Sequence, residues 1–126
     1  MITRYPLGIN PEHADMRRLD QFGFHASLAE ISGPALVFFS AASCASCRHW
    51  KQLLKTYSAE PGASPVFEVD AGEDQALARE FELFHLPALF LFVDGEYHRP
   101  IDCAASLPVL RAAIAEALAL PAEEAP

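Results

Sequence analysis

Cysteine is scarce in this sequence, which has three cysteines in 126 residues. A small domain built on a disulfide framework carries an even set of cysteines, so an odd count of three argues against that class. Cys44 and Cys47 are separated by two residues, and Cys103 stands apart from them. A close pair with one further cysteine fits a reducing compartment, in which the pair is catalytic or binds a metal.

Basic residues are also few, with 9 Lys and Arg against 17 Asp and Glu and a formal net charge of −8. A chain without a basic patch is poorly suited to nucleic acid or to an anionic membrane surface, so we expect neither as a partner.

Long hydrophobic runs are missing as well. The longest, residues 35–39 and 86–93, fall short of the roughly 18 apolar residues that a membrane span needs. The N-terminus has no apolar stretch typical of a signal peptide, so the expected location is the cytoplasm.

Apolar residues are plentiful, because 52% of the chain is hydrophobic and 9 residues are Phe. This composition and length predict one domain with a substantial core. We divide the chain into an N-terminal extension of unclear structure over residues 1–22, a folded domain over residues 23–120 and a disordered tail over residues 121–126. Proline and glycine interrupt the first segment, and prolines flank the polar last one. Residues 15–20 fit either a short helix or an edge strand.

Hydrophobic periodicity predicts that strands and helices alternate along the domain. The predicted helices cover residues 24–31, 44–59, 73–84 and 107–119, and the predicted strands cover residues 35–39, 66–70, 88–93 and 96–101. The third helix is expected to bury Leu77, Phe81 and Phe84, and the last to bury Leu110, Ile114 and Leu118. The first two strands and the helix between them form a βαβ unit with parallel strands. Asp94-Gly95 predicts a hairpin turn between the last two strands.

The candidate chemistry lies in residues 40–47, where a strand, a turn of small residues and a helix start follow one another. Cys44 is placed at the helix N-terminus, where the helix dipole favours a thiolate. Cys47 is three residues further on, so the two cysteines share a helix face and can approach to disulfide distance. A metal half-site is the alternative for this pair, and zinc would then need two further ligands, for which Cys103, His49 and His85 are available.

The order of elements, the C-x-x-C pair, the Leu86-Pro87 strand and the Asp94-Gly95 hairpin resemble the thioredoxin family over about residues 24–118. The resemblance implies an α/β thioredoxin-like fold, a central mixed β-sheet flanked by helices on both faces. It also implies that Cys44 is the attacking thiolate and Cys47 the resolving thiol. Pro87 would be the family's cis-proline facing the disulfide, and the backbone of Leu86 would pair with an extended substrate segment. Ser43 stands where the family has Trp before the first cysteine, and we group it with Leu86 and Pro87 as substrate-binding.

Several positions depart from the family pattern. Phe38 occupies the place of a buried acid that helps to move the proton of the resolving cysteine, and Val66 the place of a buried lysine. Without that acid the proton acceptor for Cys47 is open, and water is favoured over His49. Cys103 replaces a glycine and is read as a small buried hydrophobe or as a third redox thiol. His85, two residues before Pro87, is a candidate for tuning Cys44.

Two functions follow from these observations. The first is a thiol–disulfide oxidoreductase that acts on disulfides in protein substrates and works with an unidentified reductant. No cofactor and no metal are expected, and the protein is expected to be a monomer or a weak dimer. The second is a thioredoxin-fold adaptor or chaperone that holds a partner in the Pro87 groove and makes little use of its cysteines.

Overall fold

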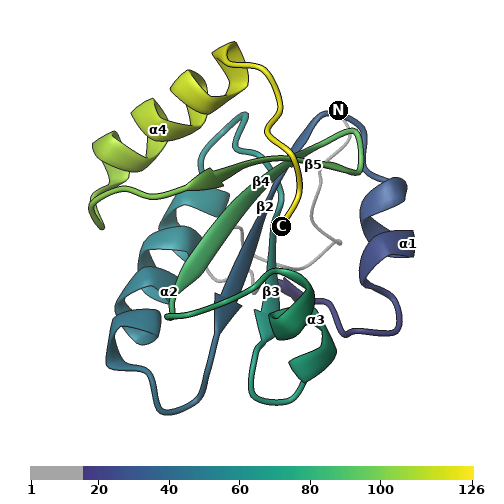
Figure 1. The fold of residues 1–126 in the computed structure, drawn as a ribbon. Helices are drawn as coiled ribbons and strands as arrows, with labels where there is room; N and C mark the ends of the chain where they lie inside the picture. The colour runs from purple at the N-terminus through teal and green to yellow at the C-terminus, as the bar shows by residue number, and fades with distance from the viewer. Residues whose placement is uncertain (1–15) are drawn as a thin grey trace, which may run out of the picture.

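The computed structural model describes residues 16–126 and contains a five-stranded mixed sheet with helices on both faces (Figure 1). The strands are β1 (Arg17–Arg18), β2 (Pro34–Ser40), β3 (Val66–Asp70), β4 (Ala88–Val93) and β5 (Glu96–Ile101), and the helices are α1 (Phe24–Ala29), α2 (Ala45–Ser58), α3 (Gln75–Glu80) and α4 (Leu107–Ala119). The strand order is β1-β3-β2-β4-β5. Strands β1, β3 and β2 run parallel, and β4 is antiparallel to β2 and to β5. This arrangement confirms the fold class expected from the sequence.

Both faces of the sheet are covered, which explains why its central strands are apolar without a break. Helices α1 and α3 pack on one face, and α2 and α4 pack on the other (Figure 1). Successive side chains of β2 alternate between the two cores: Val37 and Phe39 lie under α1 and α3, whereas Leu36 and Phe38 lie under α2 and α4. All four side chains are fully buried.

The βαβ unit and the hairpin are confirmed. Strands β2 and β3 pair in parallel, with Phe38 opposite Glu68, and α2 connects them. Asp94 and Gly95 form the turn between β4 and β5, and both residues have positive φ. The predicted limits of β3, β4, β5 and α4 are those of the structure.

The third helix is shorter than predicted, which changes the surroundings of one aromatic residue. Helix α3 ends at Glu80, and Glu82 adopts the left-handed conformation with φ 51° that commonly closes a helix. Leu77 and Phe81 are buried as expected, but Phe84 is 94% exposed. The prediction that Phe84 is buried is therefore wrong. Leu118 of α4 is also exposed, at 41%, whereas Leu110 and Ile114 are buried as expected.

The two ends of the chain differ from the expected terminal segments. Arg17–Arg18 form the edge strand β1, parallel to β3, and Leu19 is buried, so this part of the expected extension belongs to the sheet. Residues 1–15 lie outside the described residues. The tail, expected to be disordered, instead follows β5: the Glu123 N–H donates to the carbonyl oxygen of His98 at 2.7 Å, and Arg99 Nε donates to that of Pro121 at 2.8 Å. The physical reason is that β5 is an edge strand with unpaired backbone groups, which the tail satisfies.

Within residues 16–126, no helix is long and apolar enough to cross a membrane.

Candidate active site

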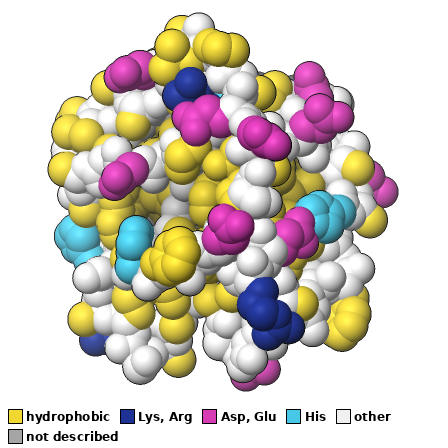
Figure 2. Space-filling view, in the orientation of Figure 1, with side chains coloured by type: hydrophobic (Ala, Val, Ile, Leu, Met, Phe, Trp, Pro, Cys, Tyr) yellow, Lys and Arg dark blue, Asp and Glu magenta, His cyan; other side chains and the backbone are white. Residues whose placement is uncertain are grey.

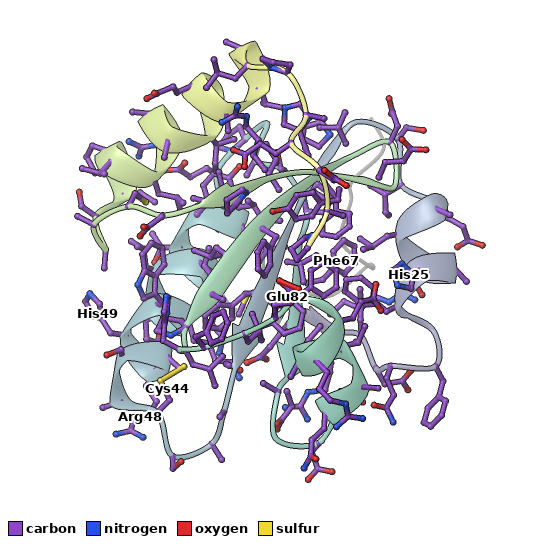
Figure 3. All side chains as sticks on the ribbon, in the orientation of Figure 1. His25, Cys44, Arg48, His49, Phe67 and Glu82 are labelled. Carbon is purple, nitrogen blue, oxygen red and sulfur yellow. A yellow bond between two sulfur atoms is a disulfide. The ribbon has the colours of Figure 1, made fainter. Side chains whose placement is uncertain are left out.

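The cysteine pair lies where β2 passes into α2. Cys44 is the N-cap residue of α2, and the backbone N–H of Cys47 donates to its Sγ at 3.1 Å. The two residues form a disulfide with a Cα–Cα distance of 5.2 Å, seen as the yellow bond at the start of α2 in Figure 3. Cys44 is partly exposed and Cys47 is 3% exposed. The predicted placement of the pair at the helix start, within disulfide distance, is confirmed.

This geometry gives the two sulfur atoms different chemistry. A sulfur at a helix N-terminus is close to the positive end of the helix dipole and to free N–H groups, which stabilise a thiolate. Cys44 has both the position and the access to solvent that an attacking thiolate requires. Cys47, one turn further and buried, can be reached from Cys44 but not from a bulky substrate. The structure therefore supports a pair with one outer and one inner sulfur.

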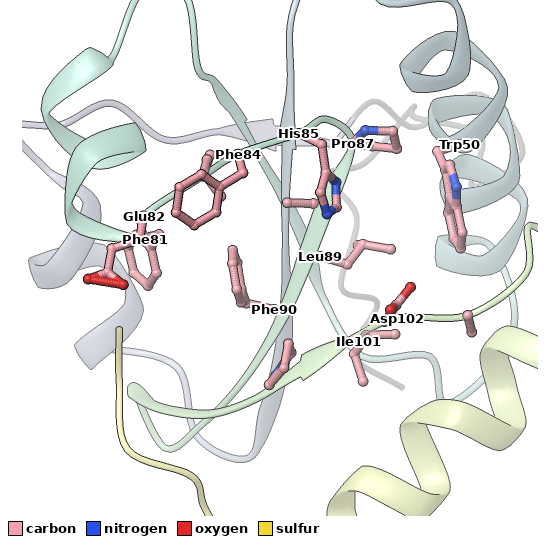
Figure 4. A pocket seen from close by; sticks show the side chains of 14 residues that line it. Trp50, Phe81, Glu82, Phe84, His85, Pro87, Leu89, Phe90, Ile101 and Asp102 are labelled. Atoms are coloured by element: carbon pink, nitrogen blue, oxygen red, sulfur yellow. The ribbon is translucent and has the colours of Figure 1, made fainter.

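The peptide bond between Leu86 and Pro87 is cis, as the resemblance implied, and it immediately precedes β4. Pro87 lines a cavity of about 330 Å³ between α2 and the segment that follows α3. Figure 4 shows Trp50 of α2 on one side of this cavity, with His85 and Pro87 facing it and Phe84 beyond them. We call it the Pro87 cavity. Its lining residues are Trp50, Pro87, Ala88, Leu89, Phe90, Pro100, Ile101, Asp102, Cys103 and residues 81–85.

The Pro87 cavity is largely apolar but has acidic groups at its edge. Figure 2 shows hydrophobic side chains lining a hollow in the middle of this face, with acidic side chains around it. Glu82 and Asp102 are the carboxylates among the lining residues. Leu86 and Cys44 both pack against the core under α2 and α4, whereas Ser43 is exposed. The roles of Leu86, Pro87 and Ser43 in substrate binding stay predictions.

The other candidate residues lie apart from the disulfide or on its outer side. Arg48 and His49 point away from the sheet at the start of α2 (Figure 3), and both are exposed. Cys103 is a free, partly exposed thiol in the wall of the Pro87 cavity. Burial, and after it the carboxylate of Asp102, raises the pKa of Cys103, which makes this thiol a weak nucleophile near neutral pH. In the part of the chain that the structure describes, no group of three or more His, Cys, Asp or Glu side chains could hold a metal ion.

Sequence reasoning missed one residue close to the pair, Glu68 of β3. Its side chain is buried beneath α2, accepts a hydrogen bond from Ser40 Oγ at 2.8 Å and forms a salt bridge with Lys51 Nζ at 3.2 Å. Glu68 and Cys47 line the same cavity of about 160 Å³. The signal was the alternation in β3: Glu68 shares a face with Val66 in a strand whose two faces are both covered. That pattern places the carboxylate in a core rather than in solvent.

Comparison with known proteins agrees with this geometry. The family model described as "Thioredoxin" matches residues 15–116. A thioredoxin of Staphylococcus haemolyticus (strain JCSC1435) is 32% identical over 72 residues, which are 56% of this chain and 66% of the relative. Thioredoxin C-2 of Corynebacterium nephridii is 32% identical over 74 residues (58% and 68%), and a thioredoxin of Mycolicibacterium smegmatis is 32% identical over 75 residues (57% and 67%).

The chain spans about two thirds of the length of the curated relatives that it matches. Together with the Cys44–Cys47 disulfide, these relatives support thiol–disulfide exchange as the general kind of chemistry. Because the family model covers most of the sequence, and the fold, the paired cysteines and the cis-proline agree with it, the chain belongs to the thioredoxin family.

Proposed function

We propose that this protein is a thiol–disulfide oxidoreductase that exchanges its dithiol with disulfides in other proteins. The observation that carries the proposal is the asymmetry of the pair: Cys44 caps α2 and is partly exposed, whereas Cys47 is buried behind it. An exposed sulfur stabilised by a helix N-terminus is the arrangement that thiolate attack on a disulfide requires.

In the reduced protein, the Cys44 thiolate attacks one sulfur of a substrate disulfide. A bond forms between Cys44 Sγ and that sulfur, and the second substrate sulfur leaves as a thiolate. Cys47 then attacks Cys44 Sγ, which forms the Cys44–Cys47 disulfide and releases the first substrate sulfur. Two electrons have passed to the substrate, and an external dithiol reductant returns the pair to its reduced form.

The Pro87 cavity is suited to an extended peptide segment that reaches toward the disulfide across Pro87. Trp50 and Pro87 supply apolar contact surface, and the carbonyl and amide groups of a partly buried Leu86 can pair with the backbone of a substrate. Glu82 and Asp102 favour segments that carry a basic residue near the reactive cysteine. In this proposal Ser43 contacts the same segment from the other side of Cys44.

The partners we propose are protein disulfide substrates and a reductant, with no nucleic acid and no membrane, in the cytoplasm. The net charge of −8 supports the exclusion of anionic polymers and surfaces.

The test is reduction of insulin disulfides with dithiothreitol as the electron source. We expect the wild-type protein to accelerate the reaction and Cys44→Ser to return it to the uncatalysed rate. Cys47→Ser should accumulate a mixed disulfide between Cys44 and insulin, visible by mass spectrometry under non-reducing conditions. Cys103→Ser should retain turnover, because the pKa of this thiol is raised.

The alternative, an adaptor or chaperone, predicts a different pattern. Such a protein would bind unfolded or extended chains equally well as wild type and as Cys44→Ser, and neither form would accelerate insulin reduction. The exposed Phe84 at the edge of the Pro87 cavity is the feature that favours this second function. Equal rates for wild type and Cys44→Ser would decide for it.

A further inference from the structure

An ion pair with a buried carboxylate joins the cysteine helix α2 to strand β3. The side chain of Glu68 is 8% exposed, and its two carboxylate oxygens have different partners: Oε1 meets Lys51 Nζ at 3.2 Å, and Oε2 accepts from Ser40 Oγ at 2.8 Å. A carboxylate is rarely buried to this extent, since removing its charge from water is costly. The lysine is 40% exposed, so only the acid of this pair is held in the interior.

Helix α2 brings Lys51, the partner of this carboxylate, onto the same face as the inner cysteine. Cys47 and Lys51 are four residues apart in α2 and therefore lie on the same helix face, one turn from each other. Lys51 contacts Glu68 directly, and Cys47, Lys51, Ser40 and Glu68 all line the cavity of about 160 Å³. A cavity of this volume has room for water between a thiol and a carboxylate.

The remaining charged groups around the cavity are otherwise engaged or solvent-exposed. They are Arg18 of β1, Arg48 of α2 and Asp70 at the end of β3. Asp70 forms a salt bridge with Arg18 at 3.3 Å, and its Oδ1 accepts from the backbone amides of Gly72 and Glu73. Asp70 therefore has a clear structural role in the loop after β3, whereas both side-chain partners of Glu68, Ser40 and Lys51, line the cavity shared with Cys47.

We propose that Glu68 accepts the thiol proton of Cys47 in the second step of the exchange. This inference rests on the proposed dithiol function. As the Cys47 sulfur forms its bond with Cys44 Sγ, the bond between Cys44 and the substrate sulfur breaks and the substrate leaves as a thiolate. The proton of Cys47 passes to the Glu68 carboxylate, directly or through one water, and from there to solvent. Lys51 and Ser40 hold the carboxylate beneath α2, so the proton acceptor is already in position before Cys47 reacts.

The two steps can be timed separately in the reduced full-length protein carrying Cys103→Ser. An aromatic disulfide that releases a coloured thiolate serves as the substrate: attack by Cys44 releases one equivalent, and attack by Cys47 releases the second. Stopped-flow absorbance follows both releases over a range of pH. Without Glu68 as proton acceptor, the rate of the second release should depend on the fraction of Cys47 that has already lost its proton to solvent.

We expect Glu68→Gln to slow the second release by about 10²-fold at neutral pH, the lower end of general-base contributions, and to leave the first release unchanged. The rate of the second release should then rise with pH throughout the range, whereas the wild type should level off. Asp70→Asn is the matched control, because it removes a carboxylate from the same cavity wall and its amide oxygen can still accept the loop hydrogen bonds. It should keep the wild-type pH profile.

Lys51→Gln provides a second test that leaves the carboxylate in place. Without the ammonium group the carboxylate loses one of the two side chains that hold it beneath α2, so the second release should slow while the first release stays unchanged. The proposal is overturned if Glu68→Gln retains the wild-type rate and pH profile of the second release, or if Lys51→Gln leaves the rate of the second release unchanged. A wild-type protein that releases no second equivalent would overturn both this inference and the proposed function.

Discussion

The two faces of the sheet are built from the same strands but have different contents. Beneath α1 and α3 lies a hydrophobic core that we call the aromatic face, in which the rings of Phe24, Phe39, Phe81 and Phe92 pack with centroids 5.4–6.4 Å apart. Beneath α2 and α4 lies the cysteine face, whose core is mainly aliphatic and also contains Cys47 and the buried carboxylate of Glu68. The inner cysteine and the buried Glu68 carboxylate therefore lie on the same side of the sheet.

The alternation of side chains along each strand produces this division. In β3, Phe67 and Val69 enter the aromatic face, whereas Val66 shares the cysteine face with Glu68. A shift of the register by one residue would exchange the two sets, so the position of the chemistry depends on the same pairing that builds the core. Stability and reactivity can therefore be altered separately, each by substitutions on its own face.

The largest expected effect is on stability, from Phe24→Ala on the aromatic face. Phe24 is fully buried and its ring contacts Phe39, Phe81 and Phe92. We expect the free energy of unfolding to fall by about 3–5 kcal/mol, measured by urea denaturation of the oxidised protein. Phe84→Ala is the matched control, and at 94% exposure it should change this free energy by less than about 0.5 kcal/mol. Equal losses for the two variants would contradict the assignment of Phe24 to the core.

The next effect concerns the hairpin that closes the aromatic face against α1. Gly95 has φ +82°, and a Cβ at this position would lie 2.7 Å from Ala29 Cα and 2.9 Å from the oxygen of Leu28. Gly33 has a similar φ of +77°, but a Cβ there would meet nothing within 4 Å. Gly33→Ala should cost about 1–2 kcal/mol for the left-handed backbone alone. Gly95→Ala should cost about 1–3 kcal/mol more, because the contact is with backbone atoms that cannot turn aside. Urea denaturation of both variants measures the difference, and equal costs would show that α1 yields to the added methyl group.

Much of this fold follows from local sequence signals. The apolar strands β2 and β4, the Asp94-Gly95 turn and the helix that Cys44 caps each depend on residues close together in the chain, and each was predicted. The cis bond before Pro87 was expected only through the family resemblance. The cysteine pair required no tertiary information, since the spacing within one helix brings Cys44 and Cys47 together.

The features that were not predicted depend on contacts distant in sequence or on unusual backbone. Helix α3 ends through a left-handed glutamate, Glu82, at a position where the sequence offers no glycine. The tail is held through Arg99 and Glu123, a salt bridge of 2.9 Å across the edge of the sheet. The Glu68 cluster needs Ser40, Lys51 and Glu68 from three different elements, so a strand pattern alone could place the acid in a core but could not name its partners.

The smallest expected change in stability comes from Glu68→Leu on the cysteine face. Leucine fills most of the volume and removes a buried charge, and replacing such charges by apolar residues is often neutral or stabilising. Lys51 is 40% exposed, so its ammonium group can turn to water once its partner is gone, and only the Ser40 hydroxyl loses an acceptor. We therefore expect the free energy of unfolding to change by less than about 1 kcal/mol in either direction, measured by urea denaturation. Release of substrate from the mixed disulfide should nevertheless slow as in Glu68→Gln. A loss of stability as large as that of Phe24→Ala would show that Glu68 holds the fold together, and the separation of stability from chemistry between the two faces would then be wrong.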